Sequence, residues 1–170
     1  MDRRRLALLA ALALTLGLGG CALHGQGANP AAAFTGEWLL EKSLGVTPPP
    51  GLAASVAATN EQVTIRSRWE PPKDGKYGLT LIGVATPEIV FDATGRDMAA
   101  QAGPFVVRHD SNWDGGKLVT HWSTSEFMGS SFHGTWTRAV SKDRATLTLD
   151  IDAMSSIGEA SRARLIYRRR

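Results

Sequence analysis

Cysteine, tyrosine and charge of one sign are scarce in this chain of 170 residues. The one cysteine, Cys21, excludes an internal disulfide and every zinc or iron–sulfur site that needs several cysteine ligands. The 19 Lys and Arg residues stand against 16 Asp and Glu residues, which gives a net charge of only +3. Proteins that bind nucleic acid carry a clustered basic surface, so we expect no nucleic-acid partner.

Residues 1–20 are predicted to be a secretory signal peptide. Arg3–Arg5 form a basic start, and Leu6–Leu18 contains only leucine and alanine apart from Thr15 and Gly17. A helix of this length spans about 20 Å, which is too short for a hydrocarbon core of about 30 Å. A basic flank, a short apolar segment and small residues behind it are typical of a secretory signal.

Cys21 follows Leu18-Gly19-Gly20, and this sequence resembles the lipobox of bacterial lipoproteins. The resemblance implies that Cys21 is acylated, for example with palmitate, and becomes the N-terminus of a protein anchored in a membrane. Two or more acyl chains anchor stably where one does not. Ala22 stands where an Asp would retain such a lipoprotein at the inner membrane, which implies the outer membrane, facing the periplasm. The alternative is an ordinary signal peptide that has a cysteine at its boundary.

Residues 21–33 are small and polar, and we expect them to be a flexible tether between the anchor and a domain at 34–170. A short helix through Ala31–Ala33 is the alternative.

The domain shows the alternation of β-strands. Val63 and Ile65 alternate with polar residues, and so do Leu147 and Leu149, with turn residues such as Asp74-Gly75 between the runs. Two short segments, 51–58 and 97–102, have helical composition instead. The expected strands are 36–41, 62–69, 77–83, 88–92, 104–112, 117–127, 132–140, 145–153 and 163–169.

Short connections between these runs predict an all-β fold, a single antiparallel up-and-down barrel of eight or nine strands. Closure into a barrel removes the two raw edges of an open sheet. A barrel of this size either packs solidly or holds one small ligand. A sandwich of two sheets is the competing architecture. A barrel that spans the membrane is not expected, because the strands lack a continuous apolar outer band.

Two ends of the domain resemble the lipocalin and calycin family, which has Gly-x-Trp on its first strand and an arginine near its last. Here Gly36 and Trp38 match the first strand, and either Arg164 or Arg168 matches the arginine. The resemblance implies that this arginine lies over the Trp38 ring and closes the bottom of the barrel. Hairpins at Trp113–Leu118 and Trp136–Asp143 also look like those of small bacterial lipocalin-like lipoproteins.

Three histidines at equal intervals, His109, His121 and His133, invite a metal site. A two-residue turn at Asp114-Gly115 places His109 opposite Thr120, and His109 and His121 then point to opposite faces of the sheet. A turn at Gly129-Ser130 separates His121 from His133 by about 16 Å. We therefore expect no metal site.

The chain shows no arrangement that would make it an enzyme, and no cofactor motif. Serines are plentiful, at Ser123, Ser125, Ser130 and Ser131, but no Gly-x-Ser-x-Gly elbow exposes one of them. Asp150 and Asp152 are two residues apart, and we interpret them as the solvent side of a strand.

Aromatic residues crowd the segment 122–136. The predicted turn at Gly129-Ser130 pairs Phe127 with Phe132 and Ser123 with Trp136, whereas Trp122 falls on the other face with Val107. Small residues beside large ones leave room for a cavity, so Phe127, Phe132, Ser123 and Trp136 are the candidate lining. The same small residues would equally fit the taper of a solid core.

The sequence thus predicts an extracytoplasmic lipoprotein whose barrel binds a small, partly apolar ligand without catalysis. An envelope scaffold or protein-interaction module with a solid core is the alternative.

Overall fold

The structure is a computed structural model that describes residues 29–69, 86–102, 105–126 and 129–170. The predicted signal peptide, Cys21, most of the tether and the expected strand 77–83 lie outside these residues. None of the helices among the described residues is long and apolar enough to cross a membrane. The described elements are α1 (Pro30–Phe34), β1 (Gly36–Leu44), β2 (Ala53–Ala58), β3 (Gln62–Arg68), β4 (Glu88–Asp92), β5 (Met98–Ala102), β6 (Phe105–Asp114), β7 (Lys117–Thr124), β8 (Phe132–Val140), β9 (Thr146–Ser155) and β10 (Ala160–Arg169).

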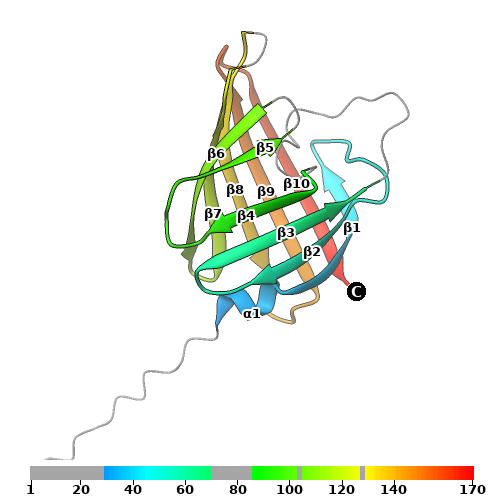
Figure 1. The fold of residues 1–170 in the computed structure, drawn as a ribbon. Coiled ribbons are helices and arrows are strands. Elements are labelled where there is room, and N and C mark those ends of the chain that lie inside the picture. Colours follow the sequence, from blue (N-terminus) through cyan, green and yellow to red (C-terminus); the bar gives the residue numbers. More distant parts are fainter. Residues whose placement is uncertain (1–28, 70–85, 103–104, 127–128) are drawn as a thin grey trace, which may run out of the picture.

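All ten strands belong to one antiparallel sheet in the order β4-β3-β2-β1-β10-β9-β8-β7-β6-β5. The sheet curls into a nearly closed barrel, in which β2, β3 and β4 cross in front of the long strands β8 to β10 (Figure 1). The two edge strands approach where Thr94 bridges to Asn112 and the Gly95 N–H donates to the Ser111 carbonyl (2.9 Å). The predicted all-β barrel is confirmed, with ten described strands in place of eight or nine.

Two of the strands, β2 and β5, were expected to have helical character, and that expectation is wrong. Alanine has a high helix propensity, and both segments are rich in it. In β2, however, Ala54 and Val56 alternate inward, and the strand forms ladders with both β1 and β3. Pairing on both sides outweighs the local propensity of a six-residue segment.

The hairpin between β6 and β7 turns one residue later than predicted. Gly115 and Gly116 have φ of 54° and 82°, which a type I′ turn requires at both central residues. Trp113 therefore pairs with Leu118, and His109 pairs with Trp122 rather than with Thr120. The difference is an even number of residues, so His109 and His121 still point to opposite faces, as predicted.

The register between β7 and β8 differs from the prediction by three residues. His121 pairs with Thr135 instead of Arg138, and Ser123 pairs with His133. The connection is longer than a two-residue turn, because β7 ends at Thr124 and β8 begins at Phe132. An odd shift exchanges the two faces of a strand. The predicted pairings of Ser123 with Trp136 and of His121 with Arg138 are therefore wrong, and the pairing of Phe127 with Phe132 involves a residue outside the described ones.

The lower end of the barrel is closed by α1 and by the first and last strands, which lie together there (Figure 1). The short helix through Ala31–Ala33 is present, so residues 30–33 belong to the folded part rather than to a tether. Its Phe34 is buried against Trp113, and the Phe34 carbonyl accepts a hydrogen bond from Trp38 Nε1 (2.9 Å). Trp38 is completely buried.

The arginine over the Trp38 ring is Arg169, at 4.4 Å from the ring centroid, and neither Arg164 nor Arg168. Even-numbered positions of β10 face solvent, so Arg164 pairs with Asp150 and Arg168 pairs with Glu41 on the outer surface. Arg169 shares the inward face with Tyr167 and donates to the carbonyls of Ala33, Thr35 and Arg144. Its Nη1 lies 3.0 Å from where a Cβ on Gly36 would be, and Gly36 has φ of 146°, so this position requires glycine.

Candidate functional site

The barrel interior holds only part of the predicted ligand-binding set. Trp136 points inward and is completely buried, and Phe132 packs against the core, edge-on to Phe105. Ser123 is exposed on the outer face, because the shifted register exchanges the faces of β7 relative to β8. It therefore cannot line an interior cavity. Phe127 lies outside the described residues.

The inward side of β7 and β8 instead forms an aromatic cluster with β4 and β6. Trp122 stacks on Trp136, with ring centroids 5.0 Å apart and planes inclined by 16°. Phe91 of β4 meets Trp136 edge-on at 6.2 Å and lies 5.1 Å from the His109 ring. Trp122 and Trp136 thus share the inward face of the sheet, whereas the sequence prediction placed them on opposite faces.

Arg138, two residues after Trp136 on β8, lies inside this cluster and was not predicted. Arg138 is buried, with only 3 % of its surface exposed to solvent. The guanidinium carbon is 4.5 Å from the centroid of Phe91 and 5.5 Å from that of Trp136. Trp136 and Arg138 are both even-numbered positions of one strand, so alternation alone would have placed Arg138 inward once Trp136 was known to point there.

Burial changes the acidity of the polar groups near the cluster. Loss of solvation lowers the pKa of Arg138 to about 10, and the neighbouring Tyr167 opposes this shift. The pKa of Tyr167 is raised, chiefly by burial, while Arg138 acts in the opposite direction. Burial, and then the charge of Arg138, lower the pKa of His109, so its imidazole is neutral at pH 7.

Several buried nitrogen atoms of the cluster have no hydrogen-bond partner. They are Nη1 of Arg138, Nε1 of Trp122 and of Trp136, and both ring nitrogens of His109. The guanidinium and indole nitrogens can only donate. The nearby buried hydroxyls are satisfied, because Ser111 Oγ and Thr120 Oγ1 lie 2.9 Å apart. Nη1 of Arg138 and the two indole nitrogens are therefore buried donors without an acceptor among the described residues.

A small cavity of about 20 Å³ lies beside Arg138. That volume accepts about one water-sized group. Its walls come from β2, β3, β8, β9 and β10 and are mostly aliphatic. The lining residues are Ala54, Val56, Ile65, Ser67, Arg138, Leu147, Leu149 and Tyr167.

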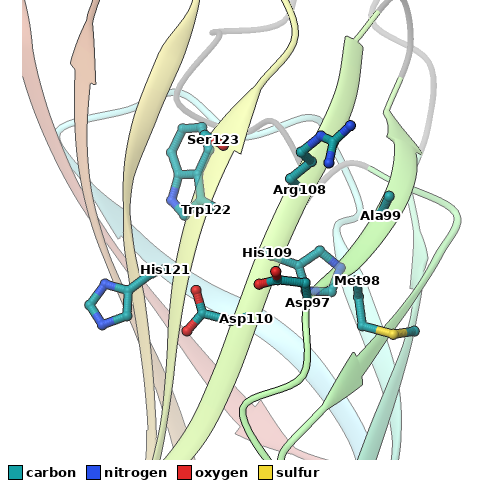
Figure 2. A pocket seen from close by; sticks show the side chains of 9 residues that line it. All are labelled: Asp97, Met98, Ala99, Arg108, His109, Asp110, His121, Trp122 and Ser123. Carbon is teal, nitrogen blue, oxygen red and sulfur yellow. The ribbon is translucent and has the colours of Figure 1, made fainter.

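Two larger hollows are shallow and involve the sheet surface. One, of about 590 Å³, lies over β9 and β10, where Asp150 pairs with Arg164 and Asp152 with Arg162. The other, of about 440 Å³, lies on β5, β6 and β7; it is lined by Arg108, Asp110, His121 and Ser123 together with His109, Trp122 and the β5 edge (Figure 2). The two aspartates of β9 lie on the solvent side, as predicted.

The three histidines do not converge on one point. His109 points into the barrel, whereas His121 and His133 are exposed on the outer face and lie closer to each other than the predicted register allowed. Among the described residues no group of three His, Cys, Asp or Glu residues could hold a metal ion. The Thr135 hydroxyl lies 3.4 Å from His121 Nδ1 on the outer face.

Comparison with known proteins supports the fold. No family model matches the chain, and no curated protein matches it. Among solved structures it is similar to the crystal structure of a secretary abundant heat soluble (SAHS) protein from Ramazzottius varieornatus. The TM-score is 0.53 at 10 % sequence identity, over 81 % of this chain and 96 % of that chain. The likeness is to a lipocalin-like, calycin-type β-barrel and concerns the fold alone.

Proposed function

We propose that this protein is a membrane-anchored extracytoplasmic lipoprotein whose barrel binds a small, partly apolar ligand without covalent chemistry. A calycin-type barrel is compatible with a ligand-binding role and with a scaffold role. The observation that favours ligand binding is the set of unpartnered nitrogens at Trp122, Trp136, His109 and Arg138. A buried donor without an acceptor costs about 1–3 kcal/mol, so several of them would destabilise a solid core.

The anchored location is the second part of the proposal. It is supported by the sequence features at residues 1–21, above all by the position of Cys21 directly after Gly19-Gly20. We propose that the lipid chains on Cys21 hold the domain at the periplasmic face of the outer membrane. Because α1 and the N-terminal end of β1 lie at one end of the barrel, the anchor would attach at that end (Figure 1).

Tryptophan fluorescence tests ligand binding directly, because Trp122 and Trp136 stack inside the barrel. We expect the emission of the delipidated domain to change saturably on titration with lipids extracted from the cell envelope. Trp38, which is buried at the closed end, provides the control: replacing Trp122 with Phe should remove most of the change, while Trp38→Phe should keep it. Unchanged tryptophan emission of the wild-type protein with all such extracts would favour the scaffold role.

A further inference from the structure

The end of the barrel that α1 closes carries a basic surface to which the fold itself gives no use. We propose that this end docks on the anionic phospholipid headgroups of the membrane that holds the anchor, chiefly through Lys142 and Arg144 of the β8–β9 turn. The barrel then stands on the bilayer with its opposite end facing away. This inference rests on the proposed lipid anchor at Cys21, and it adds the surface that meets the membrane and the charge that this surface recognises.

Contacts between distant parts of the chain join α1 and three turns into one surface (Figure 1). Trp113, next to the β6–β7 turn, packs on α1 and donates to the Asn60 carbonyl of the β2–β3 turn (2.9 Å). Arg169 joins the β8–β9 turn to α1, because it donates to the carbonyls of Arg144 and Ala33. We call the outside of this assembly the closed-end surface.

The chain that leads to the proposed anchor keeps the closed-end surface near the bilayer. Asn29 caps α1 by accepting a hydrogen bond from the Ala31 N–H (3.0 Å), and it follows Cys21 by eight positions. Eight residues span at most about 28 Å when fully extended. With lipid on Cys21, the start of α1 therefore stays within that distance of the headgroups, whereas the opposite end of the barrel is free to point away.

The two ends of the barrel carry charges of opposite sign. On the closed-end surface the cations are Lys117, Lys142, Arg144, Arg169 and Arg170, and the acids are Glu61, Asp114 and Asp143. At the opposite end the β9–β10 connection contains Glu159 and no cation, and Glu126, beyond the far end of β7, is also exposed. The wall between the ends adds little, because six of its arginines pair with acids. An anionic membrane therefore attracts the closed end and repels the other end.

Arg144 occupies a turn position at which glycine or asparagine is usual. Its φ of 59° lies in the left-handed region, which is unfavourable for most residues that have a Cβ. The side chains of Lys142 and Arg144 are exposed, and neither forms an ion pair with another described residue. Asp143, between them, accepts hydrogen bonds within the turn. Only the carbonyl of Arg144 serves the fold, as an acceptor for Arg169, so the guanidinium remains available for a headgroup phosphate.

Energy transfer from the two ends of the barrel to labelled headgroups tests this orientation in the full acylated protein. Ala32→Cys on α1 and Ile157→Cys in the β9–β10 connection are both at exposed positions and would each carry a maleimide donor dye. The vesicles consist of phosphatidylcholine with or without anionic phosphatidylglycerol, and they carry an acceptor dye on the headgroups. The two sites report different distances, because a strand of ten residues such as β9 is about 33 Å long.

We expect phosphatidylglycerol to raise the ratio of transfer from the α1 site to transfer from the β9–β10 site by about twofold or more, since each cation near an anionic surface favours contact. Molar salt should abolish this rise, because it shortens the range of the charges to about 3 Å. Lys142→Gln combined with Arg144→Asn should abolish it as well, and asparagine tolerates the φ of this position. Arg162→Gln combined with Arg164→Gln removes as many charges from the wall and should keep the rise.

The same samples separate a failed anchor from failed docking, because an acylated Cys21 cannot react with maleimide. Reaction of Cys21 in the wild-type protein overturns the anchor and the docking together. With Cys21 blocked, a transfer ratio that responds neither to phosphatidylglycerol nor to salt overturns the docking and leaves the anchor intact. A ratio that falls with phosphatidylglycerol shows that the end with Ile157 meets the membrane and contradicts the proposal, and so does a rise that survives the loss of Lys142 and Arg144. If that double variant does not fold, the salt dependence of the wild-type protein decides.

Discussion

At the residue scale, two inward arginines have different roles. One stabilises the barrel, and the other bears on its proposed function. Arg169 lies over Trp38 and donates to three backbone carbonyls, so its partners all belong to the protein. Arg138 lies among aromatic rings and has no acceptor for Nη1. The guanidinium of Arg169 is satisfied by the fold, whereas Nη1 of Arg138 has no hydrogen-bond partner among the described residues.

Arg169→Ala should destabilise the barrel by about 2–4 kcal/mol, because the cation–π contact and the charge-assisted hydrogen bonds to three backbone carbonyls are lost. Urea unfolding monitored by circular dichroism measures the change. Arg168→Ala is the matched control: Arg168 and its partner Glu41 are both exposed, so its loss should cost under about 1 kcal/mol. Similar losses for the two variants would show that Arg169 does not close the barrel.

His109 predicts a pH dependence of stability. Burial lowers the pKa of His109 in the folded protein below the ordinary value of a histidine, 6.5. Between the folded and the unfolded pKa the unfolded chain binds more protons, so stability falls as the pH decreases below about 6.5 and levels off below the folded pKa. Urea midpoints measured from pH 7.5 to pH 5 should show this decrease. His109→Leu should flatten it and His121→Leu on the outer face should not; a slope unchanged in His109→Leu would assign it to other groups.

Sequence reasoning at this scale identified Trp38 as an inward residue but chose the wrong arginine. The family pattern gives an arginine near the end of the chain without its distance from the tryptophan. Alternation resolves the ambiguity, because Leu165 and Tyr167 point inward and Arg169 follows them. The buried Arg138 was missed because a single arginine in a polar strand is indistinguishable from a surface residue until the register of the strand is known.

At the element scale, the connections between strands decide which side chains meet. Gly115-Gly116 makes a two-residue turn, and the sequence contains a second such signal at Asp114-Gly115 one position earlier. After β7 the longer connection to Phe132 changes the register by an odd number of residues and brings Trp122 next to Trp136. The positions of the strands can thus be predicted from the alternation of apolar and polar residues. The register between neighbouring strands depends on loop lengths, which composition does not reveal.

Gly134 on β8 shows how closely two strands approach. A Cβ at this position would lie 1.9 Å from the backbone oxygen of Asp152 on β9. Gly134→Ala should therefore separate β8 from β9 locally and destabilise the protein by about 1–3 kcal/mol. Thr135→Ala, the neighbouring half-buried position on the same strand, should have a smaller effect in the same urea titration. An unaltered midpoint for Gly134→Ala would mean that this close approach does not exist in solution.

At the scale of the whole molecule, the two ends of the barrel differ. The end with α1 and the C-terminus carries the plug made by Trp38 and Arg169, while the β9–β10 connection lies at the opposite end (Figure 1). The sequence predicted the antiparallel barrel correctly, since its turns leave only short connections. It could not decide between a hollow and a solid interior, because that depends on which aromatic side chains share the inner face.

Membrane attachment is a prediction for the full chain. Cys21→Ser should leave the precursor without acyl chains, so the protein should move from the detergent phase to the aqueous phase in Triton X-114 partitioning of cell extracts. The domain itself should remain folded, since residues 30–170 contain the described barrel. Equal partitioning of the variant and the wild type would contradict lipidation at Cys21.

A crystal structure of the domain grown with lipids extracted from the cell envelope tests the central claim most directly, because it shows whether the barrel interior admits a ligand. The account predicts a bound molecule inside the barrel, beside the unpartnered nitrogens of Trp122, Trp136 and Arg138. A barrel filled by its own side chains alone, with lipid absent or bound only on the outer surface, would contradict it.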